Sequence, residues 1–523
     1  MLPSPSRRTS LKLLLGSAAA TGLGIGPGAP FAHAQTPAVP TADGLPRSSP
    51  ERQGVDSAAI LAFLDEAAQA GFELQSFMLA RGGQVVAEGW WAPYRADRIH
   101  AMHSLTKSVT VCAVGLAIAE GRFQLTDRVV SFFPDRPAQP VDPNLALMTV
   151  EDLLTMRTGH ATFVSGAEWR PIKTSWIDEF FKIPVVYRPG TRFVYTSAAT
   201  FMLSAIITKT TGQSTEQYLR ARLFEPLGIS GYQWDPGPEG ITPGANGLSW
   251  KTADSLKLAL LHARGGMWEG RRILPEAWVK AVQAQHVPQT YGYQWWLGPR
   301  GAFYADGMFY QLAIAFPEQD AALAITAGIP RRSGFSKLVF KHFPAAFGGA
   351  AVGAARSDAQ LKARCAGLRL LPPPTMTASP VVSGVSGKAY RFAANADNIA
   401  SIRFDFTPGD CTFTLTDDRG THTIRAGLGR AIESSTTMTG HLLHHEYQPD
   451  TMRVSATGEW IDDRTFSMTW SFVETVFRDT VVCRFNGPFL RFDRSVNVNY
   501  ASTERPTVTG TMDGSPWLAS PAG

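Results

Sequence analysis

The segment AMHSLTKSVTVCAVGLAIAEG, residues 101–121, places Ser104 and Lys107 one helical turn apart at the start of a run that is apolar almost all round. A helix with this composition is normally enclosed by other elements on every side. The segment therefore predicts a buried helix at the centre of a large domain. Its lysine needs an explanation, because burial disfavours the charged form of an amine.

A chemical explanation is that Lys107 activates Ser104. Poor solvation would lower the pKa of Lys107 and leave a fraction as a neutral amine that can accept a proton. The helical spacing puts this amine beside the Ser104 hydroxyl, and the unpaired N–H groups of a helix N-terminus favour a developing oxyanion. These are the minimum components for acyl transfer. In the structural alternative, Ser104 caps the helix and Lys107 extends into solvent.

Two other segments carry compatible groups. In RFVYTSAATFMLSAII, residues 192–207, Tyr195 and Ser197 stand at the entry of a second apolar helix. A tyrosine near a lysine can exist partly as phenolate and relay a proton to a leaving group. Asp306 and Gly307 are expected inside a strand, where the glycine lets a substrate approach the backbone closely. The structural alternatives are a half-buried tyrosine and a bulge or turn.

Taken in this order, HSLTKS, VYTS and FYADGMFYQ resemble motifs of the penicillin-recognising serine hydrolases. The resemblance is strongest to the class C β-lactamase-related esterases, or family VIII esterases, and to the 6-aminohexanoate-dimer hydrolases. It extends over roughly residues 50–348 and includes LLTMRTGH, LFEPLGI and RRILPEAW. It implies an α+β domain in which helices flank an antiparallel sheet.

The same resemblance implies a role for each polar group. Ser104 would be the nucleophile, Lys107 the general base and Tyr195 the proton relay. The backbone N–H groups of Ser104 and Met308 would form the oxyanion hole. No cofactor belongs to this mechanism. No metal site is expected either, because the histidines of HLLHHE, residues 441–446, do not converge on one face of a strand.

Ser197, Asp306 and Gly307 are the expected substrate-binding residues, and the sequence departs from the family at two of them. The late-strand motif of the family usually begins with lysine or histidine, where this chain has Ala305 followed by Asp306. Ser197 stands where asparagine is common. No cation at this motif would then hold a substrate carboxylate. We therefore expect a neutral ester, or an amide with an ammonium near the scissile bond, in preference to a β-lactam.

The first residues have the pattern of an export signal. SRRTSLKLLL and the later AHA predict a twin-arginine signal cleaved after Ala34, and hence a periplasmic or secreted protein. The apolar run is too short and too rich in glycine to be a membrane anchor. Removing this segment deletes Arg7, Arg8 and Lys12, which lowers the formal net charge from +5 to +2. No cationic block remains, so nucleic acid is not an expected partner.

Hydrophobic patterning divides the rest of the chain. A helix over residues 58–70, a hairpin from SFMLA to VVAEGWW and three adjacent antiparallel strands within residues 291–328 indicate an α+β domain. Short alternating segments near the C-terminus indicate an all-β barrel or sandwich that resembles a lipocalin-like domain. The expected divisions are a signal peptide at 1–34, a linker at 35–50, a hydrolase domain at 51–348, a linker at 349–386, a β-barrel at 387–494 and a tail at 495–523.

Several other residues carry structural expectations. Asp462 and Asp463 are expected to form a turn between strands. Four cysteines are too few for a disulfide scaffold, and a bridge between Cys411 and Cys483 is left open. The aromatic candidates to line a substrate pocket are Trp90, Trp91, Trp295 and Trp296.

The function expected from these observations is that of an exported serine hydrolase. It would cleave an ester or amide bond of a small molecule through an acyl-enzyme on Ser104. A β-lactamase or a D-Ala-D-Ala peptidase is the alternative among enzymes. A second alternative is a non-catalytic binding protein whose β domain holds a lipid or a glycan.

Overall fold

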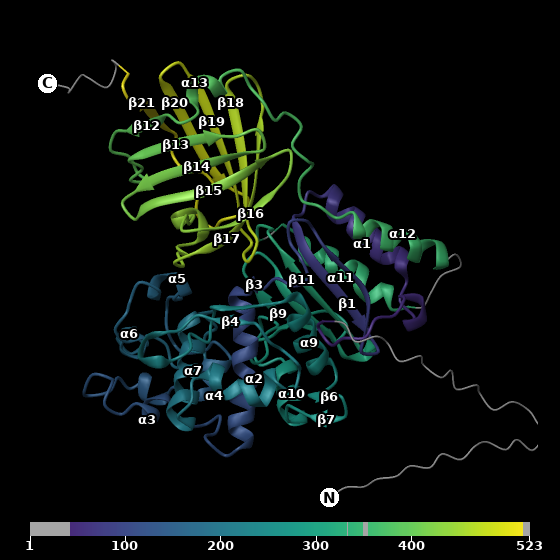
Figure 1. Cartoon of the computed structure of the whole chain (residues 1–523). Helices are drawn as coiled ribbons and strands as arrows, with labels where there is room; N and C mark the ends of the chain where they lie inside the picture. The colour runs from purple at the N-terminus through teal and green to yellow at the C-terminus, as the bar shows by residue number, and fades with distance from the viewer. Residues whose placement is uncertain (1–41, 332, 349–353, 516–523) are drawn as a thin grey trace, which may run out of the picture. The chain divides into compact units, whose positions relative to one another are not determined.

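The computed structural model describes residues 42–331, 333–348 and 354–515 (Figure 1). The predicted export signal, residues 1–34, lies outside these ranges. The described residues form a mixed domain of helices and strands followed by an all-β domain, which confirms the predicted fold class. None of the described helices is long and apolar enough to cross a bilayer.

Six antiparallel strands form the central sheet of the first domain, in the order β2-β1-β11-β10-β9-β8. The strands are β1 (Leu74–Arg81), β2 (Gln84–Trp90), β8 (Trp296–Leu297), β9 (Phe303–Gly307), β10 (Gln311–Phe316) and β11 (Ala321–Ala327). The early hairpin therefore pairs with the last strand of the domain, β11 (Figure 1). The predicted hairpin and the late antiparallel strands are confirmed. The run AFYADGMFYQLAIAF holds two strands instead of one, because the chain turns between Gly307 and Gln311.

The two faces of this sheet carry side chains of different size. The face with Ala313 and Ala322 packs against α9 (Thr252–Ala263), and its small side chains let the helix approach closely. The opposite face carries Ile325 and shares a hydrophobic cluster with α1 (Ser57–Gln69), α11 (Phe335–Ala346) and α12 (Ala354–Ala366). Helix α1, in purple, and α12, in green, lie side by side although they are far apart in the sequence (Figure 1).

The buried helix predicted from residues 101–121 is α2 (Thr106–Ala119). Gly115 makes room for the ring of Trp278, because a Cβ at this position would lie 2.3 Å from Trp278 Cδ1. Helix α7 (Ser197–Thr211) packs against α2. The remaining helices of the domain are α3 (Val129–Phe132), α4 (Val150–Leu154), α5 (Gly166–Trp169), α6 (Trp176–Lys182), α8 (Thr215–Leu219) and α10 (Glu276–Gln283). Two small sheets contain β3 (His100–Ala101), β4 (Gln233–Trp234), β5 (Leu248–Trp250), β6 (Met267–Trp268) and β7 (Arg271–Arg272).

The second domain is a β-barrel, as predicted. Its strands are β12 (Ala389–Phe392), β13 (Ser401–Phe406), β14 (Asp410–Asp417), β15 (Gly420–Leu428), β16 (Ile432–Thr436), β17 (Met452–Trp460), β18 (Thr465–Phe472), β19 (Arg478–Asn486), β20 (Phe489–Val496) and β21 (Val508–Met512). The barrel closes because β15 also pairs with β17, with Gly427 opposite Thr457, and β16 is attached to β17. Phe413 and Trp470 are among the residues that fill its core. A lipocalin barrel has fewer strands, so the resemblance to that family stays a prediction.

The predicted tail at 495–523 is wrong for its described part. Strand β21 lies within it and pairs with β12 and β20. Gly510 of this strand faces the ring of Phe392, where a Cβ would lie 2.7 Å from Cζ. A strand of this length gives only a weak hydrophobic pattern in the sequence. One of its two partners, β12, is also far away in the sequence, so local reasoning does not reveal the pairing.

The two predicted linkers also contain ordered structure. The described part of the first linker, residues 42–50, runs along β2, where Val85 N donates to the carbonyl oxygen of Pro46 at 2.8 Å. The second linker contains α12, whose Leu361 is buried against the first domain. Leu45 anchors the first segment. In the second, Leu361 and Leu368 are buried in a cluster of the first domain, and Val385 is buried in the core of the barrel. The residues around these side chains are mostly polar or small, so the two segments lack the hydrophobic pattern that predicts ordered structure.

Replacing Gly115 by alanine should destabilise the first domain, although alanine normally favours a helix. The added methyl group would collide with Trp278, whose indole N–H donates to the carbonyl oxygen of Val111 at 3.1 Å. Overpacking of this kind costs about 1–3 kcal/mol, so the thermal unfolding temperature should fall measurably. The control is Ala119→Ser, at the exposed end of the same helix, which should stay close to wild type. A Gly115 variant as stable as wild type would contradict this packing.

Candidate active site

Ser104 and Lys107 lie together at the start of the central helix. Ser104 belongs to the 3-10 turn His103–Leu105, and Lys107 belongs to the first turn of α2. Lys107 Nζ donates hydrogen bonds to Ser104 Oγ at 3.0 Å and to the carbonyl oxygen of Ala245 at 3.1 Å. Lys107 is 1% exposed. The alternative in which this lysine extends into solvent is therefore wrong.

The buried position changes the protonation of this lysine. Burial, and to a smaller extent the charge of Arg331, lowers the pKa of Lys107 to about 7. Ser197 Oγ accepts a further hydrogen bond from Nζ at 3.3 Å. Near neutral pH the amine therefore exists in both forms, and its neutral form can take the proton of the Ser104 hydroxyl.

Tyr195 precedes α7 and contacts the same pair. Its ring lies 5.0 Å from Lys107 Nζ and stacks on Trp296, with the ring centroids 5.9 Å apart. Burial raises the pKa of Tyr195 to about 12, although a hydrogen bond with Ser104 opposes the shift. Tyr195 is therefore a neutral phenol at physiological pH, not the partial phenolate expected from its sequence context. A neutral phenol can donate a proton to a leaving group.

Strand β9 ends beside the predicted nucleophile. A Cβ on Gly307 would lie 2.1 Å from the carbonyl oxygen of Met102, so only glycine permits this approach. Met308 directly follows the strand. Ser104 and Met308, whose N–H groups are predicted to form the oxyanion hole, both line one pocket of about 610 Å³.

This pocket has an aromatic mouth. Phe163 is 60% exposed and Tyr500 is 53% exposed, and both line the pocket together with Trp296. Exposed aromatic side chains around a cavity are typical of a site for an apolar group. Tyr500 and His445 come from the C-terminal domain, so both domains contribute to the lining.

Asp306 has a partner that the sequence did not indicate. Arg331, in the loop after β11, lies 3.3 Å from the Asp306 carboxylate. Burial raises the pKa of Asp306 to about 6, and the charge of Arg331 opposes this shift. The expectation that no cation lies near this motif is wrong, because Arg331 reaches it only through the tertiary fold.

The other predicted substrate-binding residues differ in position. Ser197 lines the pocket, whereas Asp306 and Gly307 are not among its lining residues. Asn246, which sequence reasoning missed, also lines it and fills the space beside Gly166, where a Cβ would lie 1.7 Å from Nδ2.

Of the four tryptophans considered as pocket residues, Trp296 lines the pocket and Trp295 is fully buried in the core. Trp90 and Trp91 are partly buried against hydrophobic clusters of the first domain.

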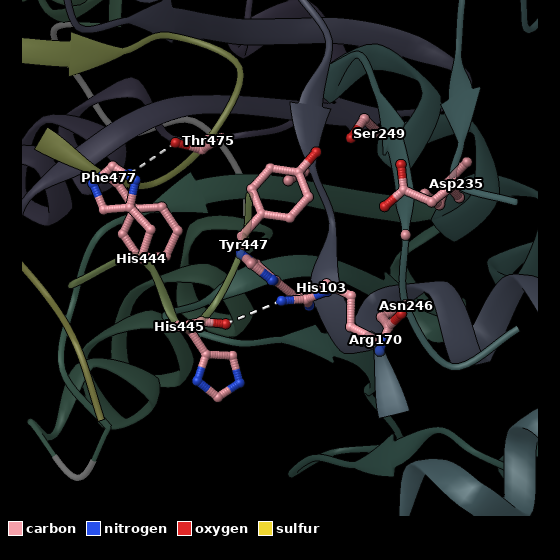
Figure 2. A pocket seen from close by; sticks show the side chains of 13 residues that line it. His103, Arg170, Asp235, Asn246, Ser249, His444, His445, Tyr447, Thr475 and Phe477 are labelled. Carbon is pink, nitrogen blue, oxygen red and sulfur yellow. Dashed lines mark hydrogen bonds between the residues drawn. The ribbon is translucent and has the colours of Figure 1, made fainter. Parts of the chain in front are cut away.

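The HLLHHE segment forms a 3-10 turn, His441–His444, in place of a strand. His444 is buried and its Nε2 lies 2.7 Å from the Asp479 carboxylate. The carbonyl oxygen of His445 accepts a hydrogen bond from Arg170 at 3.1 Å (Figure 2). Within the described ranges, no group of three or more His, Cys, Asp or Glu side chains is placed to hold a metal ion.

Two minor expectations are also resolved. All four cysteines are free thiols, so the bridge between Cys411 and Cys483 does not form. Asp462 makes the predicted turn, because its Oδ1 accepts the backbone N–H groups of Arg464 and Thr465, each at 2.8 Å.

Comparison with known proteins relates this geometry to a family. A family model described as Beta-lactamase matches residues 65–334. The 6-aminohexanoate-dimer hydrolase of Paenarthrobacter ureafaciens is 27% identical over 225 residues, which cover 40% of this chain and 57% of that protein. The lovastatin esterase of Penicillium rubens is 26% identical over 179 residues, which cover 30% of this chain and 45% of that protein.

A solved structure of a family VIII carboxylesterase aligns with a TM-score of 0.46 and 16% identity, covering 57% of this chain and 98% of that chain. The chain spans about half the length of the curated relatives it matches. Because the family model, by contrast, covers more than half of this chain, the protein belongs to the beta-lactamase family of serine hydrolases, which includes esterases and amidohydrolases.

Proposed function

We propose that the protein is an exported serine hydrolase that cleaves an ester bond through an acyl-enzyme on Ser104. The observation that carries this proposal is the 3.0 Å hydrogen bond between Ser104 Oγ and the buried Nζ of Lys107. An amine whose pKa lies near 7 can deprotonate an adjacent serine at neutral pH. The twin-arginine pattern in residues 1–34 supports export.

In the acylation step, neutral Lys107 accepts the Ser104 proton as Oγ attacks the carbonyl carbon of the ester. The tetrahedral oxyanion accepts hydrogen bonds from the N–H groups of Ser104 and Met308. Tyr195 donates its proton to the departing alkoxide, and the Lys107 ammonium returns a proton to Tyr195. The alcohol leaves, and the acyl group stays on Ser104 as an ester.

A water molecule completes the cycle. Neutral Lys107 accepts a proton from the water as the water oxygen attacks the acyl carbonyl, and the same two N–H groups hold the second oxyanion. When this intermediate collapses, the carboxylic acid is released and Lys107 returns the proton to Ser104. The resting pair of Ser104 and Lys107 is restored.

The pocket supports a neutral ester with an apolar acyl group as the substrate. Arg331 is engaged by Asp306 at 3.3 Å, so their charges largely cancel at this end of the site. The mouth presents Phe163, Trp296 and Tyr500, which offer apolar contact area.

Hydrolysis of a substrate with a free carboxylate, as in a β-lactamase or a D-Ala-D-Ala peptidase, is the second candidate. Arg170 and Arg331 favour it, because both line the pocket and a guanidinium binds a carboxylate well. The two candidates differ in whether Arg331 stays with Asp306 or turns toward the substrate.

Replacing Ser104 by alanine should lower kcat/KM for a neutral p-nitrophenyl ester at least about 1000-fold, because the nucleophile is lost. Labelling by a fluorophosphonate probe should disappear in the same variant. The matched control is Ser131→Ala, an exposed serine on α3, which should behave like wild type. Normal turnover by the Ser104 variant would remove the assignment. A wild-type protein that binds esters but resists the probe would favour a binding protein.

The rate should depend on pH through Lys107. kcat/KM for the neutral ester should fall as the pH drops below about 7, because the protonated amine cannot accept the Ser104 proton. Lys107→Arg should lose ester hydrolysis across the whole pH range, since the arginine side chain stays protonated. A wild-type pH–rate profile that is flat across neutrality would show that this amine is not the base.

Neutral p-nitrophenyl esters should be hydrolysed faster than a cephalosporin, and the reverse ranking would overturn the ester assignment.

Arg331→Gln separates the ester candidate from the carboxylate-binding candidate further. It should barely change ester hydrolysis at a pH above 8, where Lys107 is already neutral. An enzyme that uses Arg331 to hold a carboxylate would instead lose about tenfold or more in kcat/KM for the cephalosporin.

A further inference from the structure

The turn that follows β9 has an unusual backbone. Phe309 and Tyr310 both have positive φ angles, 63° and 71°, which are uncommon for residues other than glycine. His103, directly before the nucleophile, has a φ of 48°. Met308 and Ser104, the proposed oxyanion donors, are therefore each adjacent to a strained position. Such backbone persists only where the surrounding structure fixes it.

Side chains from the C-terminal domain contact these strained positions. Phe309 is 1% exposed, and its ring stacks on Tyr500 with centroids 5.2 Å apart. The Phe309 ring also meets Phe477 edge-on, with centroids 6.3 Å apart. Phe477 meets the ring of His103 in the same way at 6.5 Å (Figure 2). One side chain of the barrel domain thus contacts both segments that carry the proposed oxyanion donors.

The backbone around Phe477 is anchored on the first domain. Phe477 ends the turn between β18 and β19, and three carbonyl groups of this turn accept hydrogen bonds from the first domain. Gln75 Nε2 donates to the carbonyl oxygen of Val476 at 3.0 Å. Ala101 N donates to the carbonyl oxygen of Glu474 at 2.8 Å, and the Tyr94 hydroxyl donates to that of Thr475 at 2.9 Å. Ala101 belongs to β3, just before the nucleophile turn, so the anchor lies close to the reacting groups.

A buried network supports the ring of Phe477 from inside the barrel. His444 stacks on Phe477 with centroids 4.4 Å apart (Figure 2). His444 Nδ1 accepts the N–H of Gly440 at 3.1 Å, so Nε2 carries the proton and donates to Asp479 at 2.7 Å. Arg494 donates to the same carboxylate at 2.7 Å and balances its charge. Fully hydrogen-bonded buried networks of this kind are rigid.

We infer that Phe477 is a positioning residue that holds the oxyanion hole in its working geometry, which makes the barrel part of the catalytic apparatus. The inference rests on the proposed function. Phe477 is not among the residues that line the substrate pocket. Loss of its ring loosens the Met308 turn and His103. The hydrogen bond between Ser104 and Lys107 joins two residues of the first domain, so it is retained. Since oxyanion donors act mainly on the transition state, kcat falls and KM changes little.

The test compares Phe477→Ala and Phe477→Leu with Phe485→Ala in the full-length protein. Phe485 is 2% exposed inside the barrel and packs on Phe404 and Trp460, so its loss reports general damage to the barrel. With a neutral p-nitrophenyl ester, Phe477→Ala should lower kcat about 10- to 100-fold at nearly constant KM. Phe477→Leu should keep an intermediate kcat, because it retains part of the packing.

The control variant Phe485→Ala should keep a kcat close to wild type, and Phe477→Leu should keep the pH dependence set by Lys107. If Phe477→Ala unfolds, the test is the comparison of kcat between Phe477→Leu and wild type. The inference is overturned if the folded Phe477 variants match Phe485→Ala in kcat, or if KM rises while kcat is unchanged. A wild-type protein without esterase activity would instead reject the proposed function itself.

Discussion

A primary amine held out of water beside a serine hydroxyl is the interaction on which the rest of the site depends. In water, the ammonium form of Lys107 would dominate at neutral pH and could not act as a base. The apolar helix α2 and its neighbours remove that solvation, and the pKa of the amine falls to about 7. Three oxygen acceptors around Nζ then hold it within reach of Ser104. Among the described residues, no carboxylate raises the pKa of this amine again.

The rest of the fold fixes the positions of the other groups around Ser104 and Lys107. Gly307 brings the end of β9 against the backbone before the nucleophile, and a larger residue would collide there. Tyr195 is pressed between the lysine and Trp296, and its burial keeps the phenol protonated. The β-barrel adds Tyr500 and His445 to the lining of the pocket, so the two domains share one site.

The groups that the sequence predicted correctly lie in short contiguous patterns. Ser104 and Lys107 are one turn apart on one helix, and their proximity follows from helical geometry alone. Arg331 could not be predicted, because it meets Asp306 only after β9, β11 and the loop beyond have folded together. Strand β21 and helix α12 were missed for the same reason. Each is stabilised by partners distant in the sequence and carries few apolar residues of its own.

The titration of the Lys107 amine tests the account most directly. Protein labelled with carbon-13 at the lysine side chains can be followed by NMR across the pH range, with Lys107→Met used to assign the signal. The account predicts a midpoint near 7 for this one lysine. A midpoint close to the ordinary value of 10.5 would contradict it, because the amine would then be a permanent cation at neutral pH.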